Sequence, residues 1–369
     1  MLRALARVDL AAIERNCAEL ARVAAPAALC AVVKADGYGH GAAQAARAAQ
    51  AGGAPWLAVA TAEEAAGLRA ERIEGPLLVM GSLSEPELTV ALRARADVVV
   101  WREEQVAALA AHPDADGAGV HVKLDTGMGR LGTRDGDEAT RTAAAVAAAP
   151  GLRLAGLMTH FATADDDPEF AREQLARFLA WAGAIRARHG DLLLHAANSA
   201  ATLGIPESRL GMVRCGIAVY GMDPFGVDPA AHRLGPALEL RSYLAEVKPI
   251  APGESAGYGR RFVAGAPTWI GTVPIGYADG VRRALSNNCE VLVGGRRVPV
   301  AGTISMDNLT VDLGPEPPER GAEVVLIGAQ GGERVPAEEW ARRLGTINYE
   351  ISCGIGRRVP REYVRGTPS

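Results

Sequence analysis

Residues 31–41 read Ala-Val-Val-Lys-Ala-Asp-Gly-Tyr-Gly-His-Gly, so Lys34 ends a short apolar run and a glycine-rich turn bearing Tyr38 follows it. An ammonium group carried out of an apolar strand is costly unless something pairs with it or uses it. Lysine also forms Schiff bases with carbonyl compounds, which would be such a use. A strand-end lysine that extends its charged head to solvent is the plainer interpretation, and these residues alone leave both open.

This apolar run is the first of eight between residues 10 and 225, and a helical pattern follows most of them. Near-continuous apolar strands are typical of a parallel sheet that is buried on both faces. Eight strand–helix units in roughly 220 residues favour an α/β fold of the (β/α)8 barrel type. A doubly wound open sheet is the alternative, although no Gly-x-Gly-x-x-Gly motif follows the first strand. The predicted strands are residues 29–33, 56–60, 77–80, 97–101, 120–124, 154–159, 192–195 and 212–220.

The residue pattern of the sequence changes after residue 226, where Pro and Gly cluster and short β-branched runs recur between turn signals. Such runs, for example residues 269–273 and 323–327, predict a small, mainly antiparallel β domain. We therefore expect two domains, a barrel over residues 10–225 and a β-rich domain over residues 226–369. The N-terminal strand within residues 1–9 is expected to join the β-rich domain, and a helix is expected at residues 337–344.

The composition is that of a soluble globular protein, with 49% hydrophobic and 22% charged residues. A net charge of −4 gives no case for nucleic acid or an anionic membrane as a partner. Five scattered cysteines without metal-ligand spacing indicate free thiols in a reducing compartment and no metal site. Neither a secretory signal nor an apolar window of membrane-spanning length is present, so we expect a cytoplasmic protein.

Unusual polar residues fall where the predicted barrel strands end. In a barrel, the carboxyl ends of the strands form the catalytic face, and phosphate is often held after strands 7 and 8. Any one of these residues could be an ordinary structural hydrogen-bonding group, but their joint placement on one rim favours a functional site. The residues are Lys34, Asp125, Arg130, His160, Asn198, Ser199 and Arg214.

With these motifs the chain resembles the alanine racemase family over nearly its whole length. The resemblance implies a homodimeric pyridoxal-phosphate enzyme, built from a barrel and a β domain, that interconverts L- and D-alanine and supplies D-alanine for peptidoglycan. It implies that Lys34 forms the Schiff base with pyridoxal 5′-phosphate. It also implies a set of cofactor-binding residues: Tyr38, Ser199, the amides of Gly216 and Ile217, and Tyr349 around the phosphate, with Asn198 beside the cofactor.

The family pattern assigns Arg214 to the pyridine nitrogen. Arginine is effectively never a proton donor, so the ring would be a weaker electron sink than one paired with a carboxylic acid. A core carboxylate partner for Arg214 is the structural alternative. Racemisation needs an acid/base group on each face of the substrate α-carbon. The resemblance implies that these are Lys34 and Tyr258 of the partner subunit, with His160 tuning the tyrosine; a surface aromatic in a glycine-flanked turn is the alternative for Tyr258.

The resemblance also implies a substrate site that is shared across a head-to-tail dimer. Arg130 and the amide of Met306 would bind the substrate carboxylate, with Asp307 beside them, and Tyr277 and Tyr349 would line the corridor that leads to the site. Lys123 matches a lysine that is often carbamylated in the family, and a free ammonium is equally compatible with the sequence. Two residues depart from the common family pattern, namely Ser305 in place of Cys and Gly37 in place of Ala.

Three other functions are open. A racemase of another small amino acid, such as serine, would use the same machinery. A fold-related decarboxylase would place a carboxylate at the pyridine nitrogen. The arginine at position 214 therefore disfavours a decarboxylase. A non-catalytic pyridoxal-phosphate carrier would be a single barrel, against which the β-rich domain with Tyr258 argues.

Overall fold

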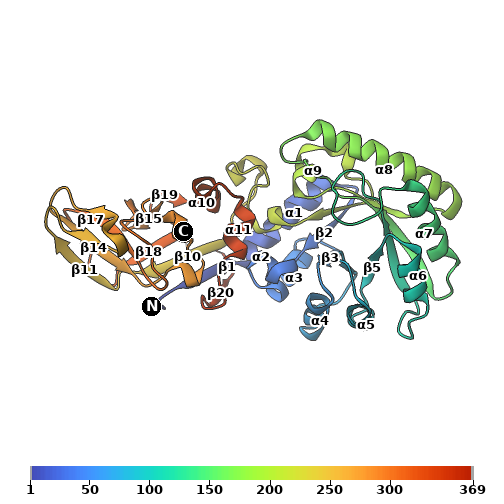
Figure 1. Cartoon of the computed structure of the whole chain (residues 1–369), viewed down its shortest axis with the longest axis horizontal. Helices are drawn as coiled ribbons and strands as arrows, with labels where there is room; N and C mark the ends of the chain where they lie inside the picture. The colour runs from blue at the N-terminus through green and yellow to red at the C-terminus, as the bar shows by residue number, and fades with distance from the viewer. Residues whose placement is uncertain (1, 367–369) are drawn as a thin grey trace. The chain divides into compact units, whose positions relative to one another are not determined.

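Eight parallel strands close into a barrel in sequence order, as the computed structural model of residues 2–366 shows (Figure 1). Closure comes from the pairing of the first barrel strand with the last, which confirms the (β/α)8 prediction and excludes an open doubly wound sheet. The strands are β2 (Ala28–Val32), β3 (Trp56–Val59), β4 (Leu77–Val79), β5 (Asp97–Val100), β6 (Ala118–Lys123), β7 (Leu152–Met158), β8 (Leu193–His195) and β9 (Met212–Cys215).

Helices follow these strands and cover the barrel. Most are short and rich in alanine; the longest is α8, which buries Phe178 and Trp181. Thr61 and Glu64 form a capping box at the start of the helix that follows the second barrel strand, with the Glu64 amide donating to the Thr61 hydroxyl at 3.2 Å. The helices are α1 (Leu10–Ala24), α2 (Lys34–Tyr38), α3 (Ala42–Ala51), α4 (Ala62–Ala70), α5 (Glu85–Arg93), α6 (Glu103–Ala110), α7 (Gly136–Ala148), α8 (Pro168–His189) and α9 (Ser199–Gly204).

The last predicted barrel strand, residues 212–220, was too long. The strand β9 ends at Cys215, and after Gly216 the chain turns into a 3-10 helix over Ile217–Tyr220. The apolar run looked continuous because both the strand end and the 3-10 turn are buried. Hydrophobicity alone therefore did not mark where the strand stops.

The remaining strands form mainly antiparallel sheets. A central sheet has the order β16-β15-β18-β10-β1-β20, a three-stranded sheet has the order β11-β14-β17, and β12 and β13 pair as a hairpin. Their bounds are β1 (Leu5–Asp9), β10 (Leu238–Tyr243), β11 (Glu246–Ile250), β12 (Ser255–Ala256), β13 (Phe262–Val263), β14 (Thr268–Val273), β15 (Glu290–Val293), β16 (Arg296–Pro299), β17 (Leu309–Gly314), β18 (Glu323–Gln330), β19 (Glu333–Val335) and β20 (Arg361–Val364), with helices α10 (Ala337–Leu344) and α11 (Asn348–Cys353).

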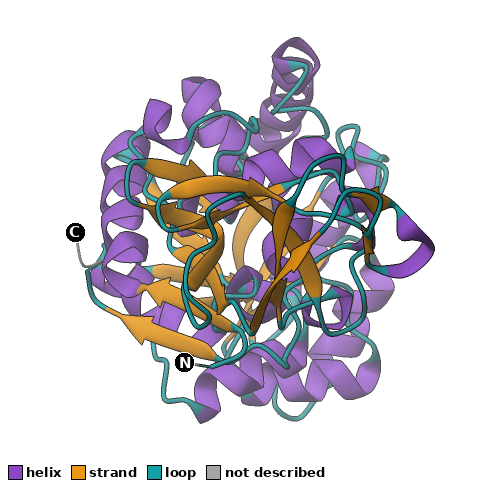
Figure 2. Cartoon of the chain, turned by 90° about the vertical axis from the view of Figure 1, so that its left-hand side faces the viewer, coloured by secondary structure: helices purple, strands orange, loops and turns teal. Residues whose placement is uncertain are grey.

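The chain divides into two compact units. The barrel unit contains Ile13–Val219 and His232–Leu234, and the β unit contains Met1–Ala12, Tyr220–Ala231 and Gly235–Ser369. The N-terminal strand β1 lies in the β unit, antiparallel to β10 and parallel to β20. Figure 2 shows the strands of both units in orange.

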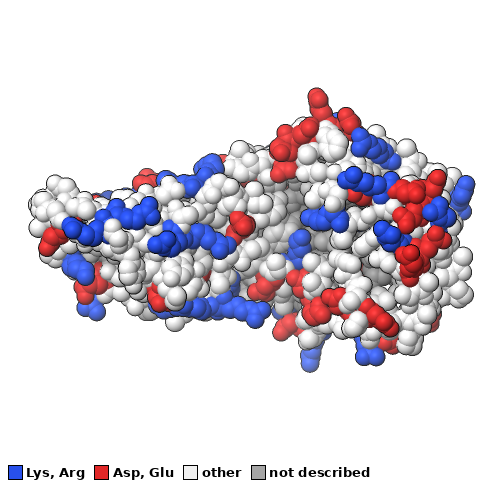
Figure 3. Space-filling model, in the orientation of Figure 1, with Lys and Arg blue, Asp and Glu red and all other residues white. Residues whose placement is uncertain are grey.

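Burial follows the two sheet types. Every residue of β4 is buried, and so are all but the first of β6, as expected for parallel strands between a packed interior and covering helices. In β10 and β17 buried and half-buried residues alternate, as in antiparallel strands with one core face. On the visible face, basic and acidic side chains are interspersed (Figure 3). Within residues 2–366, no helix has the length and apolar character required to cross a bilayer.

Candidate active site

Lys34 opens a left-handed turn at the carboxyl end of β2. The strand stops at Val32, and residues Ala35, Asp36, Gly37 and Tyr38 have φ angles of 51°, 52°, 61° and 53°. A non-glycine residue in this region costs about 1–2 kcal/mol, so the three in this turn, Ala35, Asp36 and Tyr38, persist only where the surroundings hold them. Strained backbone of this kind clusters at functional sites.

Two carboxylates hold this turn in place. Glu64 accepts a hydrogen bond from the amide of Ala35 at 2.6 Å, and Asp36 accepts one from the amide of Ala42 at 2.9 Å. Gly37 relieves part of the strain because its φ of +61° suits glycine, and an added Cβ would lie 3.3 Å from the Cβ of Ala45. Glycine in place of the family's alanine is therefore compatible with this turn.

Tyr38, Ser199 and Gly216 converge at the ends of three barrel strands. The Ser199 hydroxyl accepts hydrogen bonds from the amides of Gly216 at 3.0 Å and Ala218 at 3.4 Å. The Tyr38 hydroxyl lies so close to Gly216 that a Cβ there would be 2.3 Å from it. Asn198 caps α9 by accepting from the amide of Ala201 at 2.9 Å. The structure thus brings together the residues predicted as a phosphate cradle in the barrel, with Ile217 directly after Gly216.

Arg214 is buried on β9, with only 3% of its surface exposed. Its guanidinium donates to the carbonyls of Thr159 at 2.8 Å and Ala196 at 3.1 Å. It also contacts the Nδ1 atoms of His195 at 2.9 Å and His160 at 3.1 Å. Among residues 2–366 its hydrogen-bond and ion-pair partners include no carboxylate, so the core ion pair considered as an alternative is not formed.

The contacts of Arg214 fix the tautomers of both histidines. Burial lowers the pKa of Arg214 to about 10, which still leaves it protonated at neutral pH. A guanidinium has only donors, so the Nδ1 atoms of His160 and His195 must accept and the proton of each ring lies on Nε2. Burial and the charge of Arg214 lower the pKa of both histidines well below the usual value, and both rings are neutral.

Several cations share this end of the barrel. Burial, followed by the charges of Arg214 and Arg130, lowers the pKa of Lys123 to about 8, and the charge of Lys34 acts in the same direction. Asp125 partly offsets them. Its carboxylate accepts from the amides of Gly127, Met128 and Gly129, and so shapes the loop that carries Arg130. This concentration of positive charge suits an anionic ligand.

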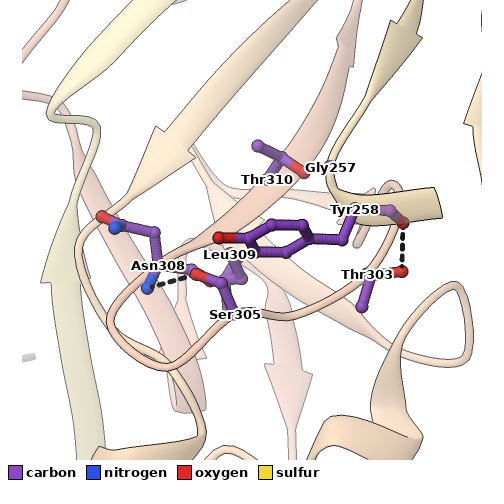
Figure 4. A pocket seen from close by; sticks show the side chains of 7 residues that line it. All are labelled: Gly257, Tyr258, Thr303, Ser305, Asn308, Leu309 and Thr310. Atoms are coloured by element: carbon purple, nitrogen blue, oxygen red, sulfur yellow. Dashed lines mark hydrogen bonds between the residues drawn. The ribbon is translucent and has the colours of Figure 1, made fainter. Parts of the chain in front are cut away.

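The β unit gathers a second group of predicted site residues around the loop at 302–308. The Thr303 hydroxyl donates to the carbonyl of Tyr258 at 2.8 Å, and the amide of Tyr277 donates to the carbonyl of Ser305 at 3.0 Å. Tyr258 is 74% exposed, Met306 51% and Tyr277 41%. Tyr258 lies across a pocket of about 380 Å³ (Figure 4). The pocket is lined by Gly257, Tyr258, Thr303, Ser305, Asn308, Leu309 and Thr310.

A buried carboxylate supports this loop cluster. Asp279 is fully buried, accepts from the amide of Gly276 at 3.0 Å and pairs with Arg3 and Arg358. Arg358 also binds Asp307 at 2.7 Å, so Asp307 is engaged in an ion pair. Tyr349 lies on α11 of the β unit, whereas Tyr38 and Ser199 belong to the barrel unit, so the two parts of the predicted phosphate cradle lie in different units.

Comparison with known proteins identifies this arrangement. Residues 8–224 match the family model for the alanine racemase N-terminal domain, and residues 237–363 match the model for the alanine racemase C-terminal domain. The chain belongs to the alanine racemase family. This is an isomerase family whose function is the interconversion of L- and D-alanine.

Alanine racemases of several bacteria are similar to the chain over nearly its full length. The enzyme of Geobacillus kaustophilus is 43% identical, covering 97% of this chain and 94% of that protein. The crystal structure of alanine racemase from Streptomyces lavendulae is 40% identical with a TM-score of 0.93, covering 100% of this chain and 98% of that one. The crystal structure of alanine racemase from Bacillus anthracis with bound L-Ala-P is 37% identical with a TM-score of 0.90, covering 99% of this chain and 96% of that one.

Sequence reasoning missed several polar residues around the alanine racemase site. His195 and His121 are fully buried in the barrel, and Asp279 is fully buried in the β unit. A histidine within an apolar strand, as in Val-His121-Val, was the available signal for the first two. No local pattern marks Asp279, because its partner Arg3 lies 276 residues away in the sequence.

Proposed function

We propose that this chain racemises alanine with pyridoxal 5′-phosphate bound through Lys34, and that Lys34 and Tyr258 of the partner subunit are the two acid/base groups. The observation that carries the proposal is the convergence of Lys34, the Ser199–Gly216 contact and Arg214 at one end of the barrel. When bound, the cofactor would acidify the α-C–H bond of an amino acid attached to it.

The barrel residues fit this cofactor in three respects. The hydroxyls of Tyr38 and Ser199 and the amides around Gly216 offer donors to a phosphate dianion. The bare Cα of Gly216 leaves the space that a Cβ would fill at 2.3 Å from the Tyr38 hydroxyl. The surrounding cations favour an anionic group. Asn198 and His160 complete the set of cofactor-binding residues, and Tyr349 would add a further hydroxyl.

Arg214 would donate a hydrogen bond to the pyridine nitrogen while keeping its own proton. Its Nη1 and Nη2 atoms already contact backbone carbonyls and histidines, which hold the guanidinium in one orientation. A group that stays protonated cannot transfer its proton to the nitrogen, and the ring would withdraw electrons less strongly. This property favours reversible proton exchange over side reactions such as transamination.

Two groups would move the α-proton. The Nζ atom of Lys34 takes or gives the proton on one face, and the phenol oxygen of Tyr258 from the partner subunit serves the opposite face. Arg130 and the amide of Met306, next to Asp307, would hold the substrate carboxylate. Tyr277 and Tyr349 would narrow the corridor to the site and favour a methyl side chain.

A homodimer with composite sites is supported by the exposure of the β unit's site residues. Tyr258, Tyr277 and Met306 carry large apolar surfaces that face solvent in a single chain. Clustered exposed apolar side chains mark interaction surfaces. In the dimer these residues would complete the barrel site of the other subunit.

Lys123 is proposed to be carbamylated. The lowered pKa of about 8 gives a fraction of neutral amine at neutral pH, and only that form adds to CO₂. The N–C bond forms with release of one proton and leaves an anion between Arg130 and Arg214. That anion would offset the cation repulsion and hold Arg130 in place.

The cellular setting is proposed in line with the family. The enzyme would act in the cytoplasm and supply D-alanine for peptidoglycan. We propose that the cofactor domain is residues 10–225 and that the second domain is residues 226–369 with the strand of residues 1–9.

Reduction with borohydride tests the cofactor assignment. The purified protein should lose its visible absorption on reduction, and peptide mapping should find the label on Lys34 alone. Incubation with a panel of L-amino acids and chiral analysis of the products then tests the reaction. Alanine should racemise fastest; a preference for serine, or release of CO₂, would replace the proposal with one of its alternatives.

A further inference from the structure

A chain of hydrogen bonds crosses the barrel interior behind Arg214. The Nη1 atom of Arg214 lies 2.9 Å from Nδ1 of His195, and Nε2 of His195 lies 2.8 Å from Nδ1 of His121. Nε2 of His121 in turn lies 3.2 Å from Oδ2 of Asp97. Four different strands supply the chain: β9, β8, β6 and β5. Asp97 opens β5 at the amino-end face of the barrel, whereas Arg214 is close to the catalytic face.

We infer that His195, His121 and Asp97 are positioning residues, forming a one-directional hydrogen-bond relay that fixes the orientation of Arg214 and leaves it as the donor. The inference rests on the proposed role of Arg214 and goes beyond it, because it concerns the residues that hold the guanidinium from the barrel interior. We refer to them below as the relay.

The direction of the relay follows from its two ends. Arg214 can only donate, so Nδ1 of His195 accepts and its proton lies on Nε2. That proton can only be donated to Nδ1 of His121, which places the proton of His121 on Nε2. The Asp97 carboxylate, which only accepts when ionised, receives it. Every N–H therefore points from Arg214 toward Asp97, and both rings are neutral.

The barrel leaves room for this arrangement at two glycines. A Cβ on Gly119 would lie 2.3 Å from the carboxylate atoms of Asp97, and one on Gly156 would lie 2.6 Å from Nδ1 of His121. Trp56 packs edge-on against His121, with ring centroids 6.0 Å apart. An alanine at either glycine would have to displace a polar group of the relay.

The charges around the relay favour a neutral His195. Arg214 lies on one side of this ring, and Lys123 acts on both His195 and His160. A proton added to His195 would be placed against the guanidinium, and burial opposes it as well. At the other end of the relay, Asp97 also meets Arg153 at 3.4 Å, whose side chain is largely exposed. The carboxylate of Asp97 accepts the N–H of His121 and so stabilises the tautomer that Arg214 imposes.

The tautomers can be measured on the cofactor-free protein by magic-angle-spinning NMR with ¹⁵N-labelled histidine. The chain has only seven histidines, and His121→Gln and His195→Gln assign the two signals. In the wild type both rings should carry a single proton on Nε2 from pH 6 to pH 8. A proton on Nδ1 of either ring, or a doubly protonated ring, would overturn the relay.

Asp97→Asn tests whether the charge of the carboxylate strengthens the relay. The amide oxygen still accepts from Nε2 of His121, so the tautomers that Arg214 imposes stay, but this hydrogen bond loses its charge and weakens. We expect the ¹⁵N signal of His121 Nε2 to shift and, in the loaded enzyme, a kcat for alanine about tenfold lower with KM and cofactor absorption unchanged. Asp114→Asn, which breaks the exposed ion pair with Arg93, is the matched control and should leave both readouts at wild-type values.

The outcomes separate the relay from the proposed function. An unchanged ¹⁵N signal of His121 Nε2 in Asp97→Asn, or a shifted signal with an unchanged kcat, would contradict the relay. Absence of a borohydride label on Lys34 would instead contradict the cofactor assignment, and the tautomer measurement on the cofactor-free protein would still stand.

Discussion

The hydroxyl of Ser199 accepts the amide hydrogen of Gly216, joining the start of α9 to the end of β9 at 3.0 Å. This contact fixes the space between the two strand ends at which the phosphate is proposed to bind. Tyr38 closes the same space from the left-handed turn after Lys34, and its hydroxyl lies directly over Gly216. The cradle therefore depends on three chain segments that meet at one unsubstituted Cα.

Gly216→Ala should weaken cofactor binding by at least tenfold, because its Cβ would lie 2.3 Å from the Tyr38 hydroxyl and would push that ring out of the cradle. Titration of the cofactor-free protein with pyridoxal phosphate, followed by absorbance, measures the change. Gly183→Ala is the control, since nothing lies within 4 Å of its added Cβ in α8. It should gain up to about 1 kcal/mol of stability and bind cofactor normally.

Tyr258→Phe should retain cofactor but exchange the α-proton of one alanine enantiomer far more slowly than that of the other. The variant removes the phenol oxygen and leaves Lys34 to serve its own face. Proton NMR in deuterium oxide, run separately with L- and D-alanine, measures both rates. Tyr243→Phe, on β10, is the control. Near-wild-type exchange from both enantiomers would contradict the two-base assignment.

Lys123 should make the protein more stable as the pH rises above neutrality. Its folded pKa of about 8 lies below the ordinary value of 10.5, so between these pH values the unfolded chain binds more protons. The free energy of unfolding should therefore rise across this window, by roughly 3 kcal/mol in total. Urea unfolding of wild type and Lys123→Met in CO₂-free buffer from pH 7.5 to 10.5 measures the difference. If the unfolding free energy of the wild type does not rise with pH relative to that of Lys123→Met, burial does not depress the pKa of Lys123.

Asp279→Asn should destabilise the β unit by about 3 kcal/mol, because a fully buried carboxylate that pairs with two arginines is neutralised. The loops of Tyr277 and Met306 rest on this group, so KM for alanine should rise more than kcat falls. Urea unfolding and steady-state kinetics measure the two effects. Asp228→Asn, which loosens the exposed pair with Arg334, is the control and should cost under about 1 kcal/mol.

The barrel strands were predictable from the sequence, because parallel strands buried on both faces are short, nearly continuous apolar runs. The end of the last one was not, since Ile217 and Val219 are as buried in a 3-10 turn as they would be in a strand. The left-handed conformation of the turn after Lys34 was also not predictable from the sequence. Ala35 and Asp36 do not favour positive φ, and their conformation is imposed by Glu64 and by the packing of α3.

The residues that we propose to carry the chemistry stand in local sequence motifs, whereas the residues that hold them in place do not. Arg214 stands in a recognisable motif, but its partner His195 became visible only when β8 and β9 were placed side by side. His121 and His195 lie 74 residues apart, and neither has a neighbour in sequence that marks it. Hydrogen bonds between distant strands depend on barrel register, which a periodicity argument does not supply.

The placement of β1 has a consequence for biosynthesis. This strand lies between β10 and β20, so the central sheet is complete only when β20, which pairs with β1 at one edge, has been made. All eight barrel strands have been synthesised once Cys215 is made, and the barrel can close while translation continues. The central sheet must wait for β20, which ends at Val364, so a chain cut short before this strand should close its barrel but leave β1 without one of its two partner strands.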